Sequence, residues 1–352
     1  MLIDIHSHLV MPEYLEYLTG RGNLPKAVVN GGAYFISCSG GYTQTSSAVH
    51  ADVEQKLRDM EEIGVDLAVI NHGIPGPEML GGAEADDWAA RMNDFQAGVI
   101  QQYPGKFIGW ANIGFGSPER SIAEVDRCIN ELGYKGVQLF SNINQKVVDS
   151  PEFMPVYRHI AKLGVPINLH PTAPMNLNGM DLQPLVRGMS LMFDSTLATM
   201  RLVMSGIFEQ EPGFTLIVPH TGGWVPYLRG RVERIIDSYT PPEGQPKLAR
   251  PSAESVDRIY VDTVAHSPET MKYCYEMFGP ERIMFGTDHP FTSWEIYREM
   301  MDGLECTDAE RELIYHGNAE RLLGISAPLR RWIPQGKLSR TQKYQPASSA
   351  DG

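Results

Sequence analysis

Two histidines separated by one residue, His6 and His8, are the first side chains whose type and spacing could do chemistry. They follow the apolar residues Leu2, Ile3 and Ile5, which are typical of a short buried strand. Because side chains two apart in an extended chain point to the same face, both imidazoles can face one point in space. Neutral imidazole nitrogens are good ligands for Zn²⁺ and similar divalent ions. Alone, the pair is equally compatible with two surface histidines.

Three further ionisable residues, His170, His220 and Asp288, also come directly after apolar runs. Each could be a hydrogen-bonded core residue when considered alone. Together with the first pair they offer four imidazoles and a carboxylate, and three imidazoles with one carboxylate are a suitable ligand set for Zn²⁺ or another divalent ion. A bound water would complete the coordination and become more acidic. The sequence therefore predicts a metal site, provided that the strands bring these residues together.

The elements that must position these residues are eight short apolar runs separated by helix-like stretches, which is the pattern of parallel βαβ units. Eight such units close a (β/α)8 TIM barrel, in which the carboxyl ends of the strands form the active face. The alternative is an open doubly wound sheet, but no glycine-rich phosphate loop follows the first run. The runs are Leu2–Ile5, Leu67–Ile70, Phe107–Ala111, Val137–Phe140, Val165–Leu169, Phe214–Val218, Ile259–Val261 and Ile283–Phe285.

Two segments do not fit the repeating pattern. Residues 11–50 are rich in Gly, Ser and Thr and too long for an ordinary loop, so we expect a small cap insertion after the first strand. Residues 326–352 are polar and are expected to form a C-terminal tail or arm. The α/β barrel itself is then expected to span residues 1–325.

The composition restricts the class of protein. With 352 residues and 42% hydrophobic content, the chain can bury a large core. Its formal net charge of −13 argues against nucleic acid and against an anionic membrane surface as partners. The four cysteines are widely spaced and form no C-x-x-C, which is typical of reduced thiols. We expect no membrane span and no signal peptide, and hence a cytoplasmic protein.

Four motifs carry a resemblance to a known family. They are His6-Ser-His8, "NLHP" around His170, "PHTGGWVPYLRGR" from Pro219 to Arg231, and "MFGTDHPF" from Met284 to Phe291. In this order they resemble the amidohydrolase superfamily, and most closely its branch of aminocarboxymuconate semialdehyde decarboxylase and hydroxybenzoate-type decarboxylases. The closing "HGNAERLLGI", which begins at His316, is also similar to that branch.

The resemblance implies a role for each matching residue. His6, His8, His170 and Asp288 would bind the metal, and Asp288 would also take part in catalysis. His220 would be the general acid/base. Many superfamily hydrolases hold two metals bridged by a modified lysine at the end of strand four.

In this chain, strand four is expected to end in Leu139-Phe140-Ser141, and Lys135 lies at its other end. We therefore expect one divalent ion, with Zn²⁺ first and Mn²⁺ second.

The resemblance also suggests residues that would contact the substrate. Arg231, or alternatively Arg229, would pair with a substrate carboxylate, because a guanidinium can hold it bidentately. His289 would contact substrate or brace its turn, and Trp224 would form an apolar wall or simply pack. Residues 34–50 lack the basic residue that some relatives have there, which puts a second substrate carboxylate in doubt.

The expected function is metal-dependent, non-oxidative decarboxylation of a small unsaturated or aromatic carboxylic acid. The alternative is a metal-dependent hydrolase or hydratase that uses a metal-bound water on an amide, lactone or C=C bond. His72 and Asp262 also end strand-like runs; His72 could line the pocket or pack, and Asp262 could orient a neighbour by a hydrogen bond. By resemblance, the chain is expected to form a homodimer or a larger homo-oligomer.

Overall fold

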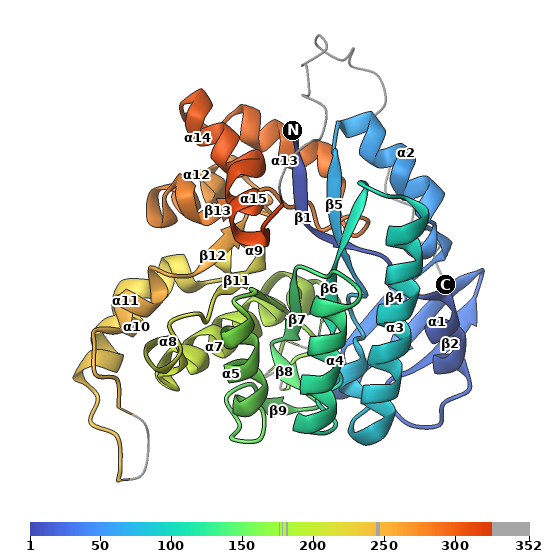
Figure 1. Ribbon diagram of the computed structural model, residues 1–352, viewed down its shortest axis with the longest axis horizontal. Coiled ribbons are helices and arrows are strands. Elements are labelled where there is room, and N and C mark those ends of the chain that lie inside the picture. The colour runs from blue at the N-terminus through green and yellow to red at the C-terminus, as the bar shows by residue number, and fades with distance from the viewer. Residues whose placement is uncertain (176, 178, 181, 244–246, 326–352) are drawn as a thin grey trace.

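Eight short parallel strands form one sheet that curls into a near-closed barrel (Figure 1). In this computed structural model the described residues are 1–325 except 176, 178, 181 and 244–246. The predicted C-terminal tail, 326–352, lies outside them. In sheet order the strands are β1 (Ile3–His8), β5 (Leu67–Asn71), β6 (Phe107–Asn112), β7 (Gly136–Phe140), β10 (Ile167–His170), β11 (Leu216–Val218), β12 (Tyr260–Asp262) and β13 (Ile283–Met284).

The two ends of the sheet meet where the chain after β13 runs beside β1. The backbone N–H of Ile5 donates to the carbonyl of Phe285 over 2.9 Å, and that of His8 donates to His289 over 2.7 Å. Ser7 and His289 form a parallel bridge. This closure matters for function because it brings the first and last strand ends, and the polar residues on them, next to each other.

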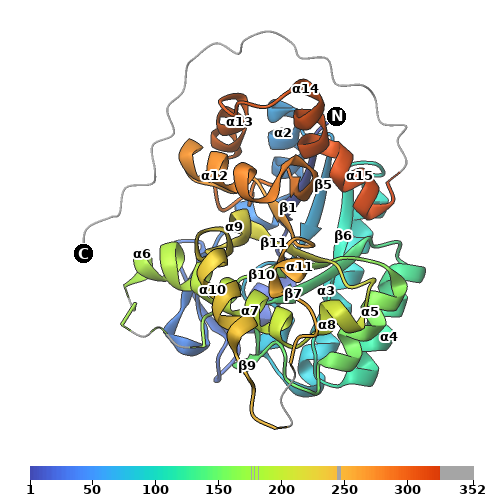
Figure 2. The same ribbon diagram turned by 90° about the vertical axis from the view of Figure 1, so that its left-hand side faces the viewer.

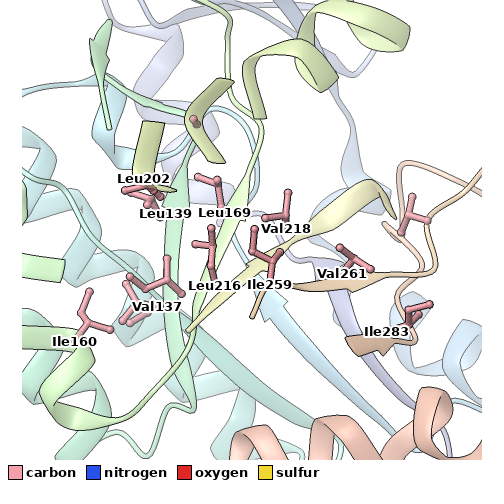
Figure 3. Packing of buried hydrophobic residues seen from close by; sticks show 14 of the residues in the cluster. Val137, Leu139, Ile160, Leu169, Leu202, Leu216, Val218, Ile259, Val261 and Ile283 are labelled. Atoms are coloured by element: carbon pink, nitrogen blue, oxygen red, sulfur yellow. The ribbon is translucent and has the colours of Figure 1, made fainter. Parts of the chain in front are cut away.

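Alternate strand positions face two different cores, as the period of two in a strand requires. Val137, Leu139, Leu169, Val218 and Val261 belong to the outer layer, where the helices pack (Figure 3). The intervening positions face residues of other strands and pack as a separate cluster with helix α15 (Asn318–Leu323). That inner cluster contains Ile3, Ile5, Leu67, Val69, Trp110, Ile217, Tyr260 and Met284.

Helices follow the strands around the outside of the barrel (Figures 1 and 2). Ser117 and Ser267 accept hydrogen bonds from the backbone of the first turn of α4 and α12, as helix N-caps do. The larger helices are α2 (Val53–Ile63), α3 (Gly82–Gln102), α4 (Pro118–Asn130), α5 (Met154–Leu163), α7 (Leu191–Met204), α10 (Val225–Ser238), α12 (Pro268–Phe278) and α13 (Trp294–Asp302).

Shorter elements connect or end the larger ones. Helix α7 is separated from the next short helix, α8 (Ile207–Gln210), because Gly206 between them adopts a left-handed φ of 76°. The last helical stretch is α14 (Asp308–Glu312), a π-helical turn (Leu313–Gly317) and α15. The remaining short helices are α6 (Gln183–Leu185), α8 (Ile207–Gln210), α9 (Pro219–Gly222) and α11 (Ser252–Val256), and another π-helical turn spans Val186–Ser190.

The segment after β1 contains structure that its composition does not predict in detail. It forms helix α1 (Pro12–Thr19) and a three-stranded antiparallel sheet of β2 (Lys26–Asn30), β3 (Ala33–Ser37) and β4 (Thr43–Ser46). Its apolar residues share a core with the loops after β5 and β10. The segment is therefore packed against one end of the barrel (Figure 1).

Two expectations about the whole chain can be compared with the structure. The four cysteines are free thiols. Among the described helices, none has the length and apolar character needed to cross a bilayer.

Candidate metal centre and active-site cavity

Four side chains from three strand ends converge at the carboxyl edge of the barrel. His6 and His8 lie on β1, His170 is the last residue of β10, and Asp288 follows β13. One ligand atom from each lies within 4.8 Å of the others. The ring centroids of His8 and His170 are 4.8 Å apart, and those of His6 and His170 are 5.1 Å apart. The barrel thus brings together the four residues that the sequence predicts as metal ligands.

The three imidazoles are held so that their Nε2 atoms face one another. The Nδ1 atom of His6 lies 2.6 Å from Asp262 Oδ2, and that of His170 lies 2.7 Å from the carbonyl oxygen of Pro171. Both partners are acceptors, so each Nδ1 carries the proton and each Nε2 has a free lone pair. The Nε2 atoms of His6 and His170 are buried and have no hydrogen-bond partner in the described part of the chain.

His8 is oriented in the same way by Asn71. Its Nδ1 atom lies 2.8 Å from Asn71 Oδ1, which also accepts a hydrogen bond from the backbone N–H of Gly73. That second bond fixes the amide with its oxygen toward the histidine, so Nδ1 of His8 is again the donor. Its Nε2 lies 3.0 Å from Asp288 Oδ1.

The Nε2 atoms of His6 and His170 thus have no hydrogen-bond partner among the described residues, and that of His8 faces a carboxylate oxygen. A divalent cation could bind all three of these nitrogens, whereas none of them can serve as hydrogen-bond donor to another.

The charges at the site also suit a cation. Burial lowers the pKa of His8, and burial together with the neighbouring imidazoles lowers the pKa of His170 well below its ordinary value. Burial also opposes protonation of His6, but the Asp262 hydrogen bond and nearby carboxylates raise its pKa overall. Burial alone would raise the pKa of Asp288, yet hydrogen bonds from His220 and His8 hold it well below its usual range. Asp288 is therefore an ionised carboxylate. Of the three imidazoles around it, those of His8 and His170 favour the neutral form.

His220 lies beside this group and is held in an uncommon backbone conformation. It follows β11 with φ 55° and ψ 51°, and its Nε2 lies 3.6 Å from Asp288 Oδ2. The next residue, Thr221, also has a positive φ, and its N–H donates to Asp262 Oδ1 over 3.0 Å. Non-glycine residues in this region cost free energy and persist where the surroundings impose them. Asp262 thus fixes both the His6 ring and the turn that carries His220.

The end of β7 is occupied by other contacts. Ser141 follows the strand, and its hydroxyl donates to Asp194 over 2.5 Å. Lys135 precedes β7 and lies at the opposite end of the strand. Within the described residues, the His6, His8, His170 and Asp288 group is the one cluster of His, Cys, Asp or Glu whose donor atoms could share an ion.

A cavity of about 810 Å³ opens beside the cluster. His170, His220, Asp288 and Trp224 lie in its wall. Apolar side chains make up much of the remaining wall, which suits a small organic ligand with a planar body. They include Ile74, Leu191, Met192, Val264 and Phe291.

The other residues predicted to contact substrate lie outside this wall. The guanidinium of Arg229 pairs with Glu233 at 2.8 Å and with Asp257 at 2.6 Å. Arg231 is exposed on α10, away from the cavity lining. Neither arginine therefore reaches the cavity of its own chain.

His289 is also absent from the cavity wall. It lies behind β1, with Nδ1 3.1 Å from the Lys56 ammonium nitrogen and Nε2 3.0 Å from Asp59 Oδ2. Of its two predicted roles, the structure fits bracing of the turn after β13. His72 packs edge-on against the Tyr14 ring, and burial lowers its pKa to about 4.

Several lining residues were not singled out from the sequence. Tyr42 and Gln44 come from the segment after β1, Arg187 from the turn before α7, and His266 from the loop after β12. The segment after β1 and the loop after β12 both follow the carboxyl ends of strands. This position is the signal that could have indicated Tyr42, Gln44 and His266 as lining residues.

Comparisons with known proteins find related sequences and a related fold. The sequence profile of the Amidohydrolase family matches residues 3–325. The chain is 28% identical over 280 residues to 2-amino-3-carboxymuconate-6-semialdehyde decarboxylase of Dictyostelium discoideum, covering 78% of this chain and 77% of that protein. It is 30% identical to decarboxylase orsB of Emericella nidulans, covering 77% of this chain and 85% of the relative.

A third relative carries out a different reaction, and a solved structure supports the fold. The chain is 26% identical to 2-keto-4-carboxy-3-hexenedioate hydratase of a Sphingobium strain, covering 76% of this chain and 81% of the relative. It superposes on 5-carboxyvanillate decarboxylase of Novosphingobium aromaticivorans with a TM-score of 0.76 and 23% identity, covering 92% and 96% of the two chains. That structure contains manganese and 4-hydroxy-3-methoxy-5-nitrobenzoic acid.

Proposed function

Because the chain belongs to the amidohydrolase family, in the branch that contains these decarboxylases, we propose that it is a metal-dependent, non-oxidative decarboxylase. Its substrate would be a small unsaturated or aromatic carboxylic acid. The observation that carries this proposal is the convergence of the His6, His8, His170 and Asp288 donor atoms beside His220, at the wall of a largely apolar cavity.

The donor set supports one divalent ion. Three imidazole nitrogens and one carboxylate oxygen suit Zn²⁺, and the manganese in the related structure makes Mn²⁺ the second choice. When bound, such an ion would act as a Lewis acid that stabilises negative charge on a substrate oxygen. The absence of a lysine at the end of β7 supports a single ion rather than two.

His220 is proposed as the residue that handles the proton. In decarboxylation the C–C bond to the carboxylate breaks, CO₂ leaves, and the electron pair stays on the substrate carbon. A proton must then replace CO₂ on that carbon, and His220 would donate it from Nε2. This role is supported by the position of Nε2, which lies 3.6 Å from Asp288 Oδ2 at the edge of the cluster.

The cavity walls would hold the substrate body. Trp224 and Phe291 lie in the wall with Leu191, and aromatic faces suit a flat unsaturated substrate. The exclusion of water by such walls strengthens the electrostatic interactions at the reacting group. The pairing of a substrate carboxylate with Arg229 or Arg231 receives no support from the position of either side chain within this chain.

The experiment has two stages. Elemental analysis of the wild type and of His170→Ala should find about one transition metal per chain in the wild type and a loss in the variant. His159→Ala is the matched control, because His159 lies on α5 and pairs with Asp126, away from the site. A wild type without metal after purification in the absence of chelator would contradict the proposed centre.

The second stage screens small unsaturated and aromatic carboxylic acids for CO₂ release without oxygen or nicotinamide. Stoichiometric CO₂ supports decarboxylation, whereas a product that retains every carbon contradicts it. The hydratase relative supports hydration or hydrolysis as the alternative. In that case one oxygen from ¹⁸O-labelled water would enter the product.

We also propose that the chain assembles into a homodimer or a larger homo-oligomer. Large apolar side chains are exposed on neighbouring elements, including Phe193 and Leu197 of α7 and Tyr227 of α10. Phe193 contacts Trp224, just before α10, so these side chains lie near one another. Exposed apolar surface of this kind favours protein contacts. Light scattering of the purified protein would measure the oligomeric state.

A further inference from the structure

The active-site cavity has one cationic side chain that the proposed reaction does not use. Among the described residues that line it, Arg187 is the one lysine or arginine. It lies in the π-helical turn Val186–Ser190, between the loop after His170 and helix α7. Its position in the chain places it on the same face of the barrel as the metal cluster.

The guanidinium of Arg187 has no acidic partner within ion-pair distance in the described part of the chain. Nearby arginines differ in this respect. Arg201, on α7, pairs with Asp149 at 2.5 Å, and Arg229, on α10, pairs with two carboxylates. Among the described residues, Arg187 therefore brings to the cavity a positive charge without a carboxylate partner, which a ligand anion could pair with.

Tyr42 is a polar residue that lines the same cavity as Arg187. The side chain of Tyr42 is buried, and its hydroxyl donates to Gln44, which also lines the cavity. Burial raises the pKa of Tyr42, while the charge of Arg187 lowers it and the charge of Asp288 raises it. The phenol thus lines the same cavity as the guanidinium and the metal-cluster carboxylate.

The acidic residues of the cavity restrict where a second anion could be bound. Asp288 belongs to the metal cluster, and Glu269 lines the cavity from α12, as do Thr270 and Tyr273. Negative charge on α12 disfavours a ligand anion on that side. The side formed by Arg187 remains, and the apolar wall at Leu191 and Met192 follows it directly along the chain.

From these observations we infer that Arg187, together with Tyr42 and Gln44 of the same cavity wall, forms a subsite for a second anionic substituent of the substrate. The substrate is then an unsaturated or aromatic dicarboxylic acid. One carboxylate is directed to the metal cluster, and the other is held by the planar guanidinium of Arg187. This inference rests on the proposed function for the placement of the first carboxylate. Arg187 would take the place of the basic residue that residues 34–50 lack.

Calorimetric titration of the metal-loaded protein with two probe acids tests the subsite. Benzoate and isophthalate differ by one carboxylate on the same ring. The wild type should bind isophthalate about tenfold or more tightly than benzoate, which is the range of a charge-assisted hydrogen bond. Arg187→Gln should abolish this preference while changing the affinity for benzoate little. Arg187→Lys should keep part of it, because an ammonium retains the charge without the planar fork.

Arg158→Gln is the matched control, because Arg158 lies on α5 beside Glu211 and outside the cavity lining. It should keep the full preference. Melting temperature and metal content must match the wild type in each variant. A preference that persists in Arg187→Gln would overturn the inference, and so would a wild type that binds both acids equally or binds neither.

The binding assay needs no turnover, so it separates the two proposals. An Arg187-dependent preference without CO₂ release from any acid would leave the subsite standing and remove the decarboxylase. CO₂ release combined with an unchanged preference for isophthalate in Arg187→Gln would support the decarboxylase and remove the subsite.

Discussion

Glu78 offers a quantitative test of the packing beneath the active site. It is 1% exposed, and its Oε1 accepts a hydrogen bond of 3.0 Å from the Thr172 hydroxyl, two residues after His170. Its Oε2 has no hydrogen-bond partner among the described residues. Burial raises the pKa of Glu78 from an ordinary value of 4.5 to about 8. The folded protein therefore favours the protonated carboxyl.

The sign of the pH effect follows from this shift. Between pH 4.5 and about 8 the folded state binds a proton that the unfolded state releases. The stabilisation by Glu78 is therefore complete below pH 4.5 and is lost as the pH rises toward 8. A shift of this size, at 1.36 kcal/mol per pKa unit, corresponds to about 5 kcal/mol between the two limits.

Glu78→Gln replaces the acid by a neutral group of nearly the same shape and removes this dependence. We expect the variant to match the wild type near pH 4.5 and to exceed its free energy of unfolding by several kcal/mol at pH 9. Urea unfolding of both proteins, followed by circular dichroism from pH 4.5 to 9, would measure the difference. Effects of other groups cancel, since only the difference between the proteins is used.

Glu61→Gln, on the exposed face of α2, is the control and should change the free energy of unfolding little at any pH. Parallel profiles of the wild type and Glu78→Gln across this range would refute the assignment of a buried, protonated carboxyl to Glu78.

Four further changes test the metal centre and the assembly. Asp262→Asn should lower metal affinity about 10- to 100-fold in a chelator competition, because the His6 Nδ1 hydrogen bond loses its carboxylate; unchanged affinity would contradict that role. Gly73→Ala should destabilise the fold by about 1–3 kcal/mol in urea unfolding and reduce metal content, since φ is +74° and the new Cβ would lie 2.9 Å from His8 Nδ1. His220→Asn should keep its metal by elemental analysis but release CO₂ about 10²- to 10⁴-fold more slowly, whereas loss of metal would make His220 a ligand. Truncation after Gly324 should reduce the apparent size in gel filtration if the tail is an arm between subunits, and unchanged elution would count against that arm.

The barrel could be predicted from the sequence because its signal is local. Each buried strand is a short apolar run, and its neighbouring helix is amphipathic, so all eight runs correspond to observed strands within a few residues. The candidate ligands could be identified for a related reason. A buried strand such as Ile167–His170 rarely ends in an ionisable residue without a function or a partner.

The segment after the first strand was harder to predict, because its three strands are antiparallel and partly exposed, and the third, β4, consists of polar residues. Such strands are specified by pairing with each other rather than by burial on both faces. The contribution of Tyr42 and Gln44 to the cavity depends on how this segment packs on the barrel. No feature of residues 11–50 alone indicates that placement.

The arginines show a second limit of sequence reasoning. Arg229 and Arg231 stand in a motif that resembles the decarboxylase branch, but a motif does not reveal the partners of a side chain. Asp257, 28 residues from Arg229, forms an ion pair with it across two helices. Arg187 follows a stretch of Pro, Met, Asn and Gly residues without a recognisable pattern, and only the folded chain places it at the cavity.

Asp262 shows why the metal ligands and the proposed acid/base cannot be treated as independent. Its Oδ2 holds the His6 ring, and its Oδ1 accepts the N–H of Thr221 in the turn that keeps His220 at a positive φ. Burial opposes ionisation of Asp262, but the His6 hydrogen bond lowers its pKa below the usual value, so it stays charged at the bottom of the site. The other two histidines are oriented by neutral oxygens, which makes His6 the most basic ligand. A change at Asp262 must therefore alter metal binding and the position of the proton donor together.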